Sequence, residues 1–214
     1  MIATLPIATP RTNVRRLSLL LALTLALLGA CGGKPKIAKL PADAVILAFG
    51  DSLTFGTGAN TQESYPAVLE RLAGRKVVAA GVPGEVSAAG LARLPAMLDQ
   101  VKPALLVLCH GGNDFLRRHD EAAAAKNVRA MVELAKNRGI AVVLIGTPKP
   151  GLFPSPPGFY ADIAKDLKLP YEDAALKKIL ADNELKSDLV HPNAKGYARL
   201  AQAVADLLTT SGAL

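Results

Sequence analysis

The 214-residue chain has few aromatic residues and no tryptophan. Aromatic side chains, on which polysaccharide-binding proteins stack sugar rings, make up 4% of the chain. This scarcity argues against a polysaccharide-specific enzyme. The chain also lacks arginine-rich arms and basic patches interleaved with aromatic residues, so its formal charge of +7 does not indicate a nucleic-acid partner.

Histidine and cysteine are also scarce, with three and two residues respectively. The chain has no His-Glu-x-x-His motif and no closely spaced pair of cysteines, so its sequence predicts no metal site. Cys31 ends an N-terminal apolar segment, and Cys109 lies in a separate apolar run over residues 104–109. We therefore expect no disulfide bond within the chain.

The first thirty residues have the form of an export signal. Arg11, Arg15 and Arg16 precede the mostly apolar run 17–30, which is shorter than the roughly 20 residues that a helix needs to span a bilayer. The run ends in small residues directly before Cys31, which resembles a bacterial lipoprotein signal with this cysteine as the lipidated residue, a palmitate carrier. An uncleaved anchor or an ordinary secretory signal is the alternative.

We therefore predict three parts in the chain. They are a signal peptide over residues 1–30, a lipidated cysteine with a flexible tether over 31–43, and a single domain over 44–214. Removal of residues 1–30 takes away three arginines and no acidic residue, so the formal charge falls from +7 to +4. This organisation predicts a lipid-anchored monomer of the bacterial cell envelope that faces the periplasm from the inner or the outer membrane.

Short apolar runs alternate with longer helical segments along the predicted domain. Four runs are continuously apolar, as strands covered on both faces are, namely 44–49, 76–80, 105–109 and 141–145. Apolar residues at helical spacing predict helices over 66–73, 88–101, 121–136 and 194–208. The alternation predicts an α/β fold with three layers, α/β/α, around a mostly parallel sheet.

Glycine and polar residues follow three of the predicted strands. Asp51 and Ser52 come after the first strand, a glycine-containing turn at 81–84 after the second, and Gly-Gly-Asn-Asp at 111–114 after the third. The carboxyl ends of parallel strands meet at one edge of a sheet, and ligands bind beyond that edge. We therefore predict a site there, with Ser52 as a candidate nucleophile.

A nucleophilic serine needs a general base, and the chain offers three histidines. The base needs one ring nitrogen free for the serine proton and the other held by a carboxylate. Asp188 lies three residues before His191 and offers this carboxylate, although the pair also fits a helix-start cap beside a surface histidine. His119 lies in a charged stretch, and His110, at the end of the third strand, has no carboxylate at a fixed offset.

The serine does not belong to an α/β-hydrolase nucleophile elbow, because Gly-x-Ser-x-Gly would require a glycine where the chain has Thr54. The chain instead resembles the SGNH hydrolases of the GDSL type. Within them it is similar to the acyl thioesterase I, lysophospholipase and arylesterase group. The resemblance covers about residues 44–208 and implies a flavodoxin-like fold with about five strands. It is carried by four segments in order, 50–54, 81–85, 111–114 and 188–191, and by residues 90–95.

This resemblance implies a role for each candidate residue. Ser52 would be the nucleophile, His191 the general base and then acid, and Asp188 the carboxylate that orients it. The oxyanion hole would consist of the backbone N–H groups of Ser52 and Gly84 and the side-chain amide of Asn113. Without the resemblance, Gly84 is equally well explained as part of a tight turn.

Substrate-binding residues are less clearly indicated. The segment 148–160 contains five prolines and follows the fourth strand, where it either walls an acyl pocket or forms a stiff surface loop. We predict a pocket wall, because loops at this edge carry function. Relatives usually carry an apolar residue where this chain has His110, which either tunes the site or is a strand-end histidine with satisfied hydrogen bonds; we favour the second. The candidate substrate-binding residues are Phe115, Leu116, Leu152, Phe153 and Phe159.

The predicted function is a lipid-anchored serine esterase or thioesterase that works through an acyl-serine intermediate. It would need no cofactor and no metal. Its substrates would be small-molecule or lipid esters, including acyl and aryl esters, with thioesters and lysophospholipids as further candidates. The alternatives are an O-acetyl esterase that acts on cell-envelope glycans and a non-catalytic envelope-binding lipoprotein.

Overall fold

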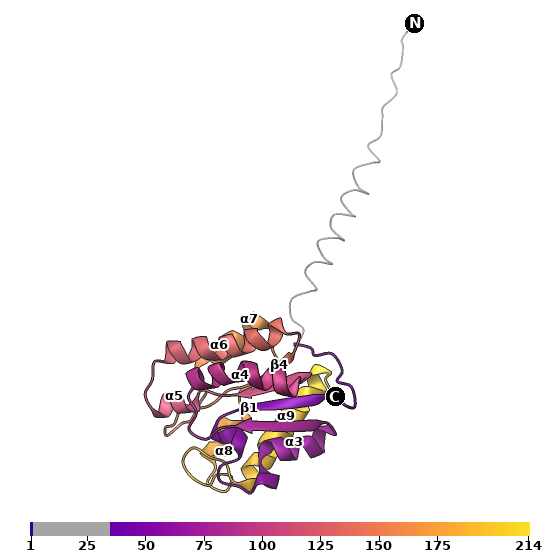
Figure 1. Cartoon of the computed structure of the whole chain (residues 1–214). Helices are drawn as coiled ribbons and strands as arrows, with labels where there is room; N and C mark the ends of the chain where they lie inside the picture. Colours follow the sequence, from indigo (N-terminus) through magenta and orange to yellow (C-terminus); the bar gives the residue numbers. More distant parts are fainter. Residues whose placement is uncertain (2–34) are drawn as a thin grey trace. The chain divides into compact units, whose positions relative to one another are not determined.

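The computed structural model describes Met1 and residues 35–214, which include five parallel strands in one sheet (Figure 1). Residues 2–30 of the predicted signal peptide and Cys31 lie outside the described residues. The strand order is β2-β1-β3-β4-β5, which is the flavodoxin-like order. The predicted α/β fold is confirmed. The strands are β1 (Val45–Gly50), β2 (Lys76–Gly81), β3 (Leu105–Cys109), β4 (Ala141–Ile145) and β5 (Tyr171–Glu172).

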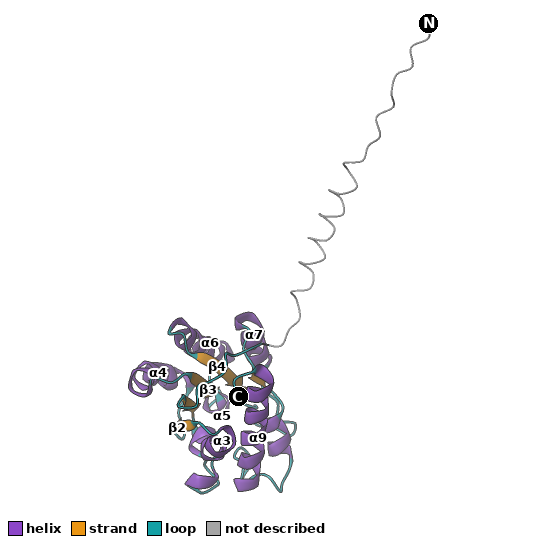
Figure 2. Ribbon diagram, turned by 90° about the vertical axis from the view of Figure 1, so that its right-hand side faces the viewer, coloured by secondary structure: helices purple, strands orange, loops and turns teal. Residues whose placement is uncertain are grey.

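Helices cover both faces of the sheet, as Figures 1 and 2 show. Successive side chains of a strand point to opposite faces, so Ile46 and Ala48 of β1 join one buried cluster and Leu47 and Phe49 join the other. This double burial explains why the strands are continuous apolar runs. The first cluster is covered by α3 (Tyr65–Ala73), α8 (Ala175–Ala181) and α9 (Ala194–Ser211), and the second by α4 (Ser87–Val101), α6 (Glu121–Asn137) and α7 (Gly158–Leu167).

The four predicted strands and four predicted helices are all present, with ends that differ by at most three residues. The shorter elements were not predicted, because two to seven residues are too few to show a periodic pattern. The helix α7 begins inside the predicted proline-rich loop 148–160, so Phe159 belongs to a helix and not to a loop. The unpredicted short elements are α2 (Ser52–Phe55), η1 (Thr61–Glu63), α5 (Gly112–Leu116), α8 and β5.

The described part of the predicted tether, residues 35–43, packs on the domain. The Ile37 N–H donates to the Ser211 carbonyl at 2.9 Å, and the Leu40 N–H donates to the Ala213 carbonyl at 2.8 Å. Leu40 is buried in the cluster that contains the apolar face of α9. The folded unit therefore begins before residue 44, because this short segment has an apolar side chain to bury. Within residues 35–214, no helix combines the length and the apolar character needed to cross a membrane.

The first three strands end at the same level of the sheet. Gly50 at the end of β1 pairs with Gly81 of β2 and with Cys109 of β3, so the loops that follow leave from one edge. The chain crosses from β1 to β2 on one side and then to β3 on the other, which places the switch point of the sheet between β1 and β3. A side chain on Gly81 would place Cβ 2.1 Å from the Phe55 backbone nitrogen, so only glycine lets α2 approach β2 this closely.

Candidate active site

Ser52 is the first residue of α2, the short helix that follows β1 directly. The carboxylate of Asp51 caps this helix by accepting a hydrogen bond from the Leu53 N–H at 3.1 Å. Asp51 is only 1% exposed, and burial raises its pKa despite this bond. A buried cap on a helix of four residues leaves the first residue little freedom, so it determines where Ser52 points.

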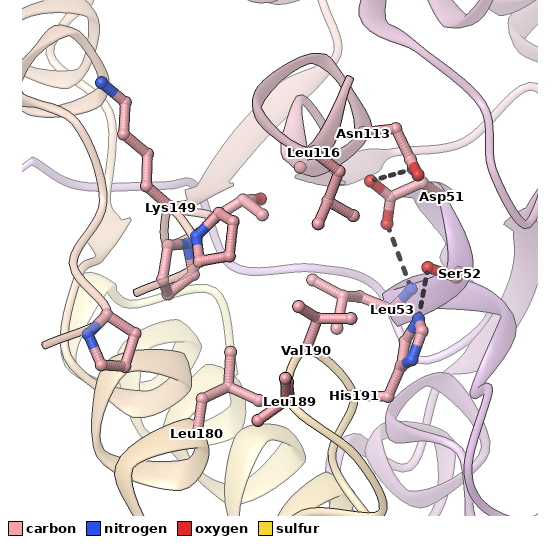
Figure 3. A pocket seen from close by; sticks show the side chains of 15 residues that line it. Asp51, Ser52, Leu53, Asn113, Leu116, Lys149, Leu180, Leu189, Val190 and His191 are labelled. Atoms are coloured by element: carbon pink, nitrogen blue, oxygen red, sulfur yellow. Dashed lines mark hydrogen bonds between the residues drawn. The ribbon is translucent and has the colours of Figure 1, made fainter. Parts of the chain in front are cut away.

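The structure brings Ser52, His191 and Asp188 together in a chain of hydrogen bonds. Figure 3 shows the link between Ser52 and His191. The Nε2 atom of His191 lies 2.9 Å from the Ser52 Oγ, although the two residues are 139 positions apart. The Nδ1 atom lies 2.7 Å from the Asp188 Oδ2. Burial works to raise the pKa of Asp188, but hydrogen bonds from His191 and from two backbone N–H groups outweigh it and lower that pKa.

These bonds determine the tautomer of His191. An ionised Asp188 can only accept, so the proton of the imidazole lies on Nδ1 and the lone pair of Nε2 faces Ser52. The Ser52 hydroxyl therefore donates to Nε2, which is the arrangement in which a histidine can take the serine proton.

Asp188 also holds the loop in which His191 lies. Its Oδ1 accepts hydrogen bonds from the Val190 N–H and the His191 N–H, both at 2.8 Å. Asn193, and not Asp188, caps the following helix α9 by accepting from the Gly196 N–H at 3.1 Å. One carboxylate oxygen of Asp188 thus shapes the loop and the other holds the imidazole, whereas the alternative that Asp188 is a helix-start cap is wrong.

Two backbone N–H groups at the sheet edge remain available to a ligand. Gly84 lies in a turn closed by a hydrogen bond from the Glu85 N–H to the Val82 carbonyl at 3.1 Å. Its φ of +78° is the left-handed conformation that favours glycine. Within residues 35–214, neither the Ser52 N–H nor the Gly84 N–H donates to a protein acceptor.

Asn113, in the first turn of α5, links the loops that follow β1, β2 and β3. Its Nδ2 donates to the Glu85 carbonyl at 3.1 Å and to the Asp51 Oδ2 at 3.3 Å. Both partners are acceptors, so the nitrogen of the amide must face them. The amide predicted for the oxyanion hole is therefore engaged with the protein in this structure, and its longer bond is the one to Asp51.

A pocket opens beside Ser52 and His191 (Figure 3). It encloses about 440 Å³, including the part that is open to solvent. The pocket lies between the loops that follow β3 and β4 and the loop that carries His191. Most of its wall is apolar and consists of Leu53, Leu116, Pro148, Pro150, Pro154, Leu180, Leu189 and Val190.

The model of the GDSL-like lipase/acylhydrolase family matches residues 48–199. The chain belongs to this family. It is 38% identical to Esterase TesA of Pseudomonas aeruginosa over 129 residues, which is 58% of this chain and 64% of the relative's length. It is 28% identical over 156 residues to an Escherichia coli K12 protein named thioesterase 1/protease 1/lysophospholipase L1, a match that covers 69% of this chain and 75% of that protein.

A crystal structure of TesA superimposes with a TM-score of 0.70 and 31% identity, and the match covers 78% of this chain and 99% of that one. The resemblance to GDSL-type hydrolases is thereby confirmed for both sequence and fold. The family match begins at the end of β1, just before Ser52, and ends in α9, just after His191. It therefore contains every residue of the hydrogen-bonded chain and of the pocket.

Of the five predicted substrate-binding residues, Leu116 lines the pocket of this GDSL family member. Phe115 and Phe159 lie outside the pocket lining and pack against each other, with ring centroids 6.2 Å apart. Leu152 and Phe153 also lie outside the lining and are each 86% exposed, in the short loop between the bridged residues 149 and 155. The loop after β4 does wall the pocket, but through its prolines and not its aromatic residues.

Sequence patterns did not reveal four apolar residues of the pocket wall, one of which is Leu53, directly after Ser52. Leu189 and Val190 stand directly before His191, so their position beside the candidate base was a signal that could have identified them. Leu180 comes from the end of α8, and no motif near it in the sequence indicates a role.

His110 is fully buried, and both of its ring nitrogens are hydrogen-bonded. Its Nε2 lies 3.1 Å from the Glu85 Oε2, and its Nδ1 accepts from the Gly111 N–H at 2.9 Å. The carboxylate partner is 25 residues away in the chain and could not be identified from a fixed offset. His119 lies on the surface, 4.0 Å from Asp114.

Cys109 ends β3 next to these residues but is unsuited to nucleophilic chemistry. It is buried, and burial raises the pKa of its thiol far above the usual value, so the reactive thiolate does not form at neutral pH. In the described part of the chain, no group of three or more His, Cys, Asp or Glu side chains is arranged to hold a metal ion.

Proposed function

We propose that this protein hydrolyses acyl or aryl esters through an acyl-serine intermediate. The observation that carries the proposal is the hydrogen-bonded chain from Ser52 through His191 to Asp188, with links of 2.9 and 2.7 Å. Ser52 and His191 line an apolar pocket, and within residues 35–214 the backbone N–H groups of Ser52 and Gly84 donate to no protein acceptor. The names of the relatives, esterase and thioesterase, support the same class of reaction.

In the acylation step, the Ser52 Oγ attacks the acyl carbonyl carbon of the substrate. The hydroxyl proton moves to the Nε2 of His191, which faces it at 2.9 Å, and the carbonyl electrons move onto the oxygen. Asp188 stabilises the imidazolium that forms. When the tetrahedral intermediate collapses, the bond to the leaving oxygen or sulfur breaks, and that atom takes the proton from Nε2. The product is an alcohol, phenol or thiol, and the acyl group remains on Ser52.

Negative charge develops on the carbonyl oxygen during this attack. The Ser52 and Gly84 N–H groups are fixed by the cap of α2 and by the 82–85 turn, so they can stabilise this oxyanion without reorganisation. The Asn113 amide becomes the third donor when it exchanges its 3.3 Å bond to Asp51 for the substrate oxygen. Loss of one such donor costs about 100- to 1000-fold in kcat.

Deacylation uses the same residues in reverse. A water molecule gives a proton to Nε2 of His191, and its oxygen attacks the acyl carbon on Ser52. The ester bond to Ser52 then breaks, the Oγ recovers the proton from Nε2, and a carboxylic acid leaves. The cycle needs no cofactor, because its only proton carrier is His191.

The pocket supports an acyl group longer than acetyl as the preferred substrate part. Burial of the acyl methylene groups against the apolar wall of the pocket stabilises the bound substrate by about 0.8 kcal/mol for each group that becomes fully buried. Thioesters and lysophospholipids are compatible with the same attack, because in both of them Ser52 would attack an acyl carbonyl carbon. The apolar pocket would bind the long acyl chain of a lysophospholipid or of a fatty acyl thioester.

We also propose that a lipid on Cys31 attaches the protein to a membrane of the bacterial cell envelope. The support is the basic, then apolar, then small-residue pattern of residues 1–30. Growth of an expressing bacterium with labelled palmitate should label the wild-type protein but not Cys31→Ser. Equal labelling of both, or of neither, would refute the attachment while leaving the enzymatic proposal untouched.

The enzymatic proposal is tested with a series of nitrophenyl esters from acetyl to octanoyl. Ser52→Ala should abolish turnover and keep the folded structure, whereas Ser211→Ala, which removes the same hydroxyl at the end of α9, should keep both. A preference for acetyl over octanoyl esters would favour an O-acetyl esterase. Failure of a fluorophosphonate probe to label Ser52, together with no turnover by the wild type, would indicate a non-catalytic binding protein.

A further inference from the structure

The loops that carry Gly84 and Asn113 are joined by a closed ring of hydrogen bonds. His110 Nε2 lies 3.1 Å from the carboxylate of Glu85, in the loop after β2. His110 Nδ1 accepts from the Gly111 N–H at 2.9 Å, in the loop after β3. The ring closes where the Asn113 amide donates to the Glu85 carbonyl at 3.1 Å. Glu85 directly follows Gly84, and Gly111 lies two residues before Asn113, so each bond of this ring connects to a residue at most two positions from a candidate oxyanion donor.

The ring determines the tautomer of His110. Nδ1 accepts from a backbone N–H, so it carries no proton, and the proton of the neutral imidazole lies on Nε2 and is donated to Glu85. Only a histidine combines an acceptor and a donor on one rigid ring, and here each contacts a different loop. The imidazole of His110 also needs the space beside Gly90 of α4, because a side chain on Gly90 would place Cβ 2.2 Å from the His110 Nε2.

Glu85 is itself anchored to the sheet. Arg93 of α4 donates to both of its carboxylate oxygens, at 2.9 and 2.7 Å. The same guanidinium donates to the Ala80 carbonyl of β2 at 3.1 Å and stacks over the Phe49 ring of β1, 4.1 Å from its centroid. The side chain of Glu85 is only 7% exposed. The ring is therefore a rigid, buried structure attached to two strands and one helix.

We propose that His110 and Glu85 are positioning residues that hold the Gly84 N–H and the Asn113 amide at the separation an oxyanion requires. This inference rests on the proposed ester hydrolysis. Neither His110 nor Glu85 lines the pocket, so neither contributes to binding the acyl group. Their loss should therefore weaken stabilisation of the transition state and leave substrate binding nearly unchanged.

The test uses four substitutions that remove different parts of the ring. His110→Leu removes both ring contacts, His110→Asn keeps an acceptor for the Gly111 N–H, His110→Gln keeps a donor for Glu85, and Glu85→Gln keeps the shape of the carboxylate. For a nitrophenyl ester that the wild type turns over, kcat should fall about tenfold or more in His110→Leu, since a displacement of about 1 Å can cost about 100-fold. KM should stay within about twofold of the wild-type value, because the ring does not contribute to binding the acyl group of the substrate.

A merely structural role is separated from positioning by a double-mutant cycle and by a control. If the ring acts through Asn113, then His110→Leu should slow an Asn113→Ala enzyme far less than it slows the wild type. Ser211→Ala removes another buried hydrogen bond, the 3.0 Å bond from the Ser211 hydroxyl to the Leu208 carbonyl at the end of α9, and should lower the melting temperature without lowering kcat.

Unchanged kcat in the folded ring variants, or losses that multiply with Asn113→Ala, would overturn the inference. If His110→Leu does not fold by circular dichroism, His110→Asn, His110→Gln and Glu85→Gln answer the same question with smaller changes. A wild type without esterase activity would refute the proposed function. An active wild type with fully active ring variants would refute only the positioning role.

Discussion

Replacement of Asp188 by asparagine should damage catalysis more, and stability less, than replacement by alanine. The two oxygens of Asp188 have separate partners: Oδ2 holds His191 Nδ1 at 2.7 Å, and Oδ1 accepts from two backbone N–H groups at 2.8 Å. In Asp188→Asn, the amide oxygen can still accept from both N–H groups and hold the loop. The amide nitrogen then faces Nδ1, and because it can only donate there, Nδ1 must become an acceptor.

The proton of His191 then moves to Nε2, where it points at the Ser52 Oγ and blocks removal of the serine proton. In serine proteases the same change lowers kcat by about 10⁴-fold. Asp188 is 52% exposed at its side chain, so water competes for Nδ1 here, and we expect a loss of about 100- to 10⁴-fold. Asp188→Ala leaves Nδ1 to water and either tautomer available, so its loss in kcat should be smaller.

The order of stability should be reversed. Asp188→Ala loses two hydrogen bonds to the loop backbone, which contribute about 1–2 kcal/mol together, whereas Asp188→Asn retains them. The assay is kcat for a nitrophenyl ester and the melting temperature of both variants. An Asp188→Asn enzyme that is faster than Asp188→Ala would refute the assigned tautomer of His191.

Two further results are expected. Burial works to raise the pKa of Glu85, but hydrogen bonds from His110 and Arg93 outweigh it and lower that pKa from 4.5 to about 2. This lowering corresponds to about 3 kcal/mol of stability at neutral pH. Because the folded-state pKa is the lower one, this stability is present above about pH 4.5 and lost as the pH falls toward 2, so the melting temperatures of wild type and Glu85→Gln should converge on acidification. If the melting temperatures of the two proteins stayed the same distance apart as the pH falls, this stability would not come from the Glu85 carboxylate. Leu189→Ala should lower kcat/KM about three- to tenfold for octanoyl esters and little for acetyl esters, because the pocket loses apolar wall, whereas Leu72→Ala on α3, outside the pocket, should change neither. Equal losses for both esters would show that Leu189 does not contact the acyl chain.

Sequence by itself determined the fold class and the candidate triad. Strands buried on both faces need apolar residues at every position, so the runs at β1, β3 and β4 were readable without any partner. Asp188 and His191 belong to one turn, and Ser52 follows a strand directly, so local spacing was enough to nominate them. The alternative that Asp188 is a helix-start cap could not be excluded from local spacing, because only the structure shows that Asn193 caps α9.

Only the tertiary structure decided which side chains meet across loops. The partner of His110 is Glu85, and nothing in a 25-residue separation predicts that contact, since it depends on the side-by-side pairing of β1 with both β2 and β3. In α5, Leu116 lines the pocket while Phe115 turns to Phe159 of α7, because neighbouring residues of a helix face different directions and the neighbours are set by packing. Local spacing determines which residues share a strand, a turn or a helix face, and the arrangement of those elements determines what each face contacts.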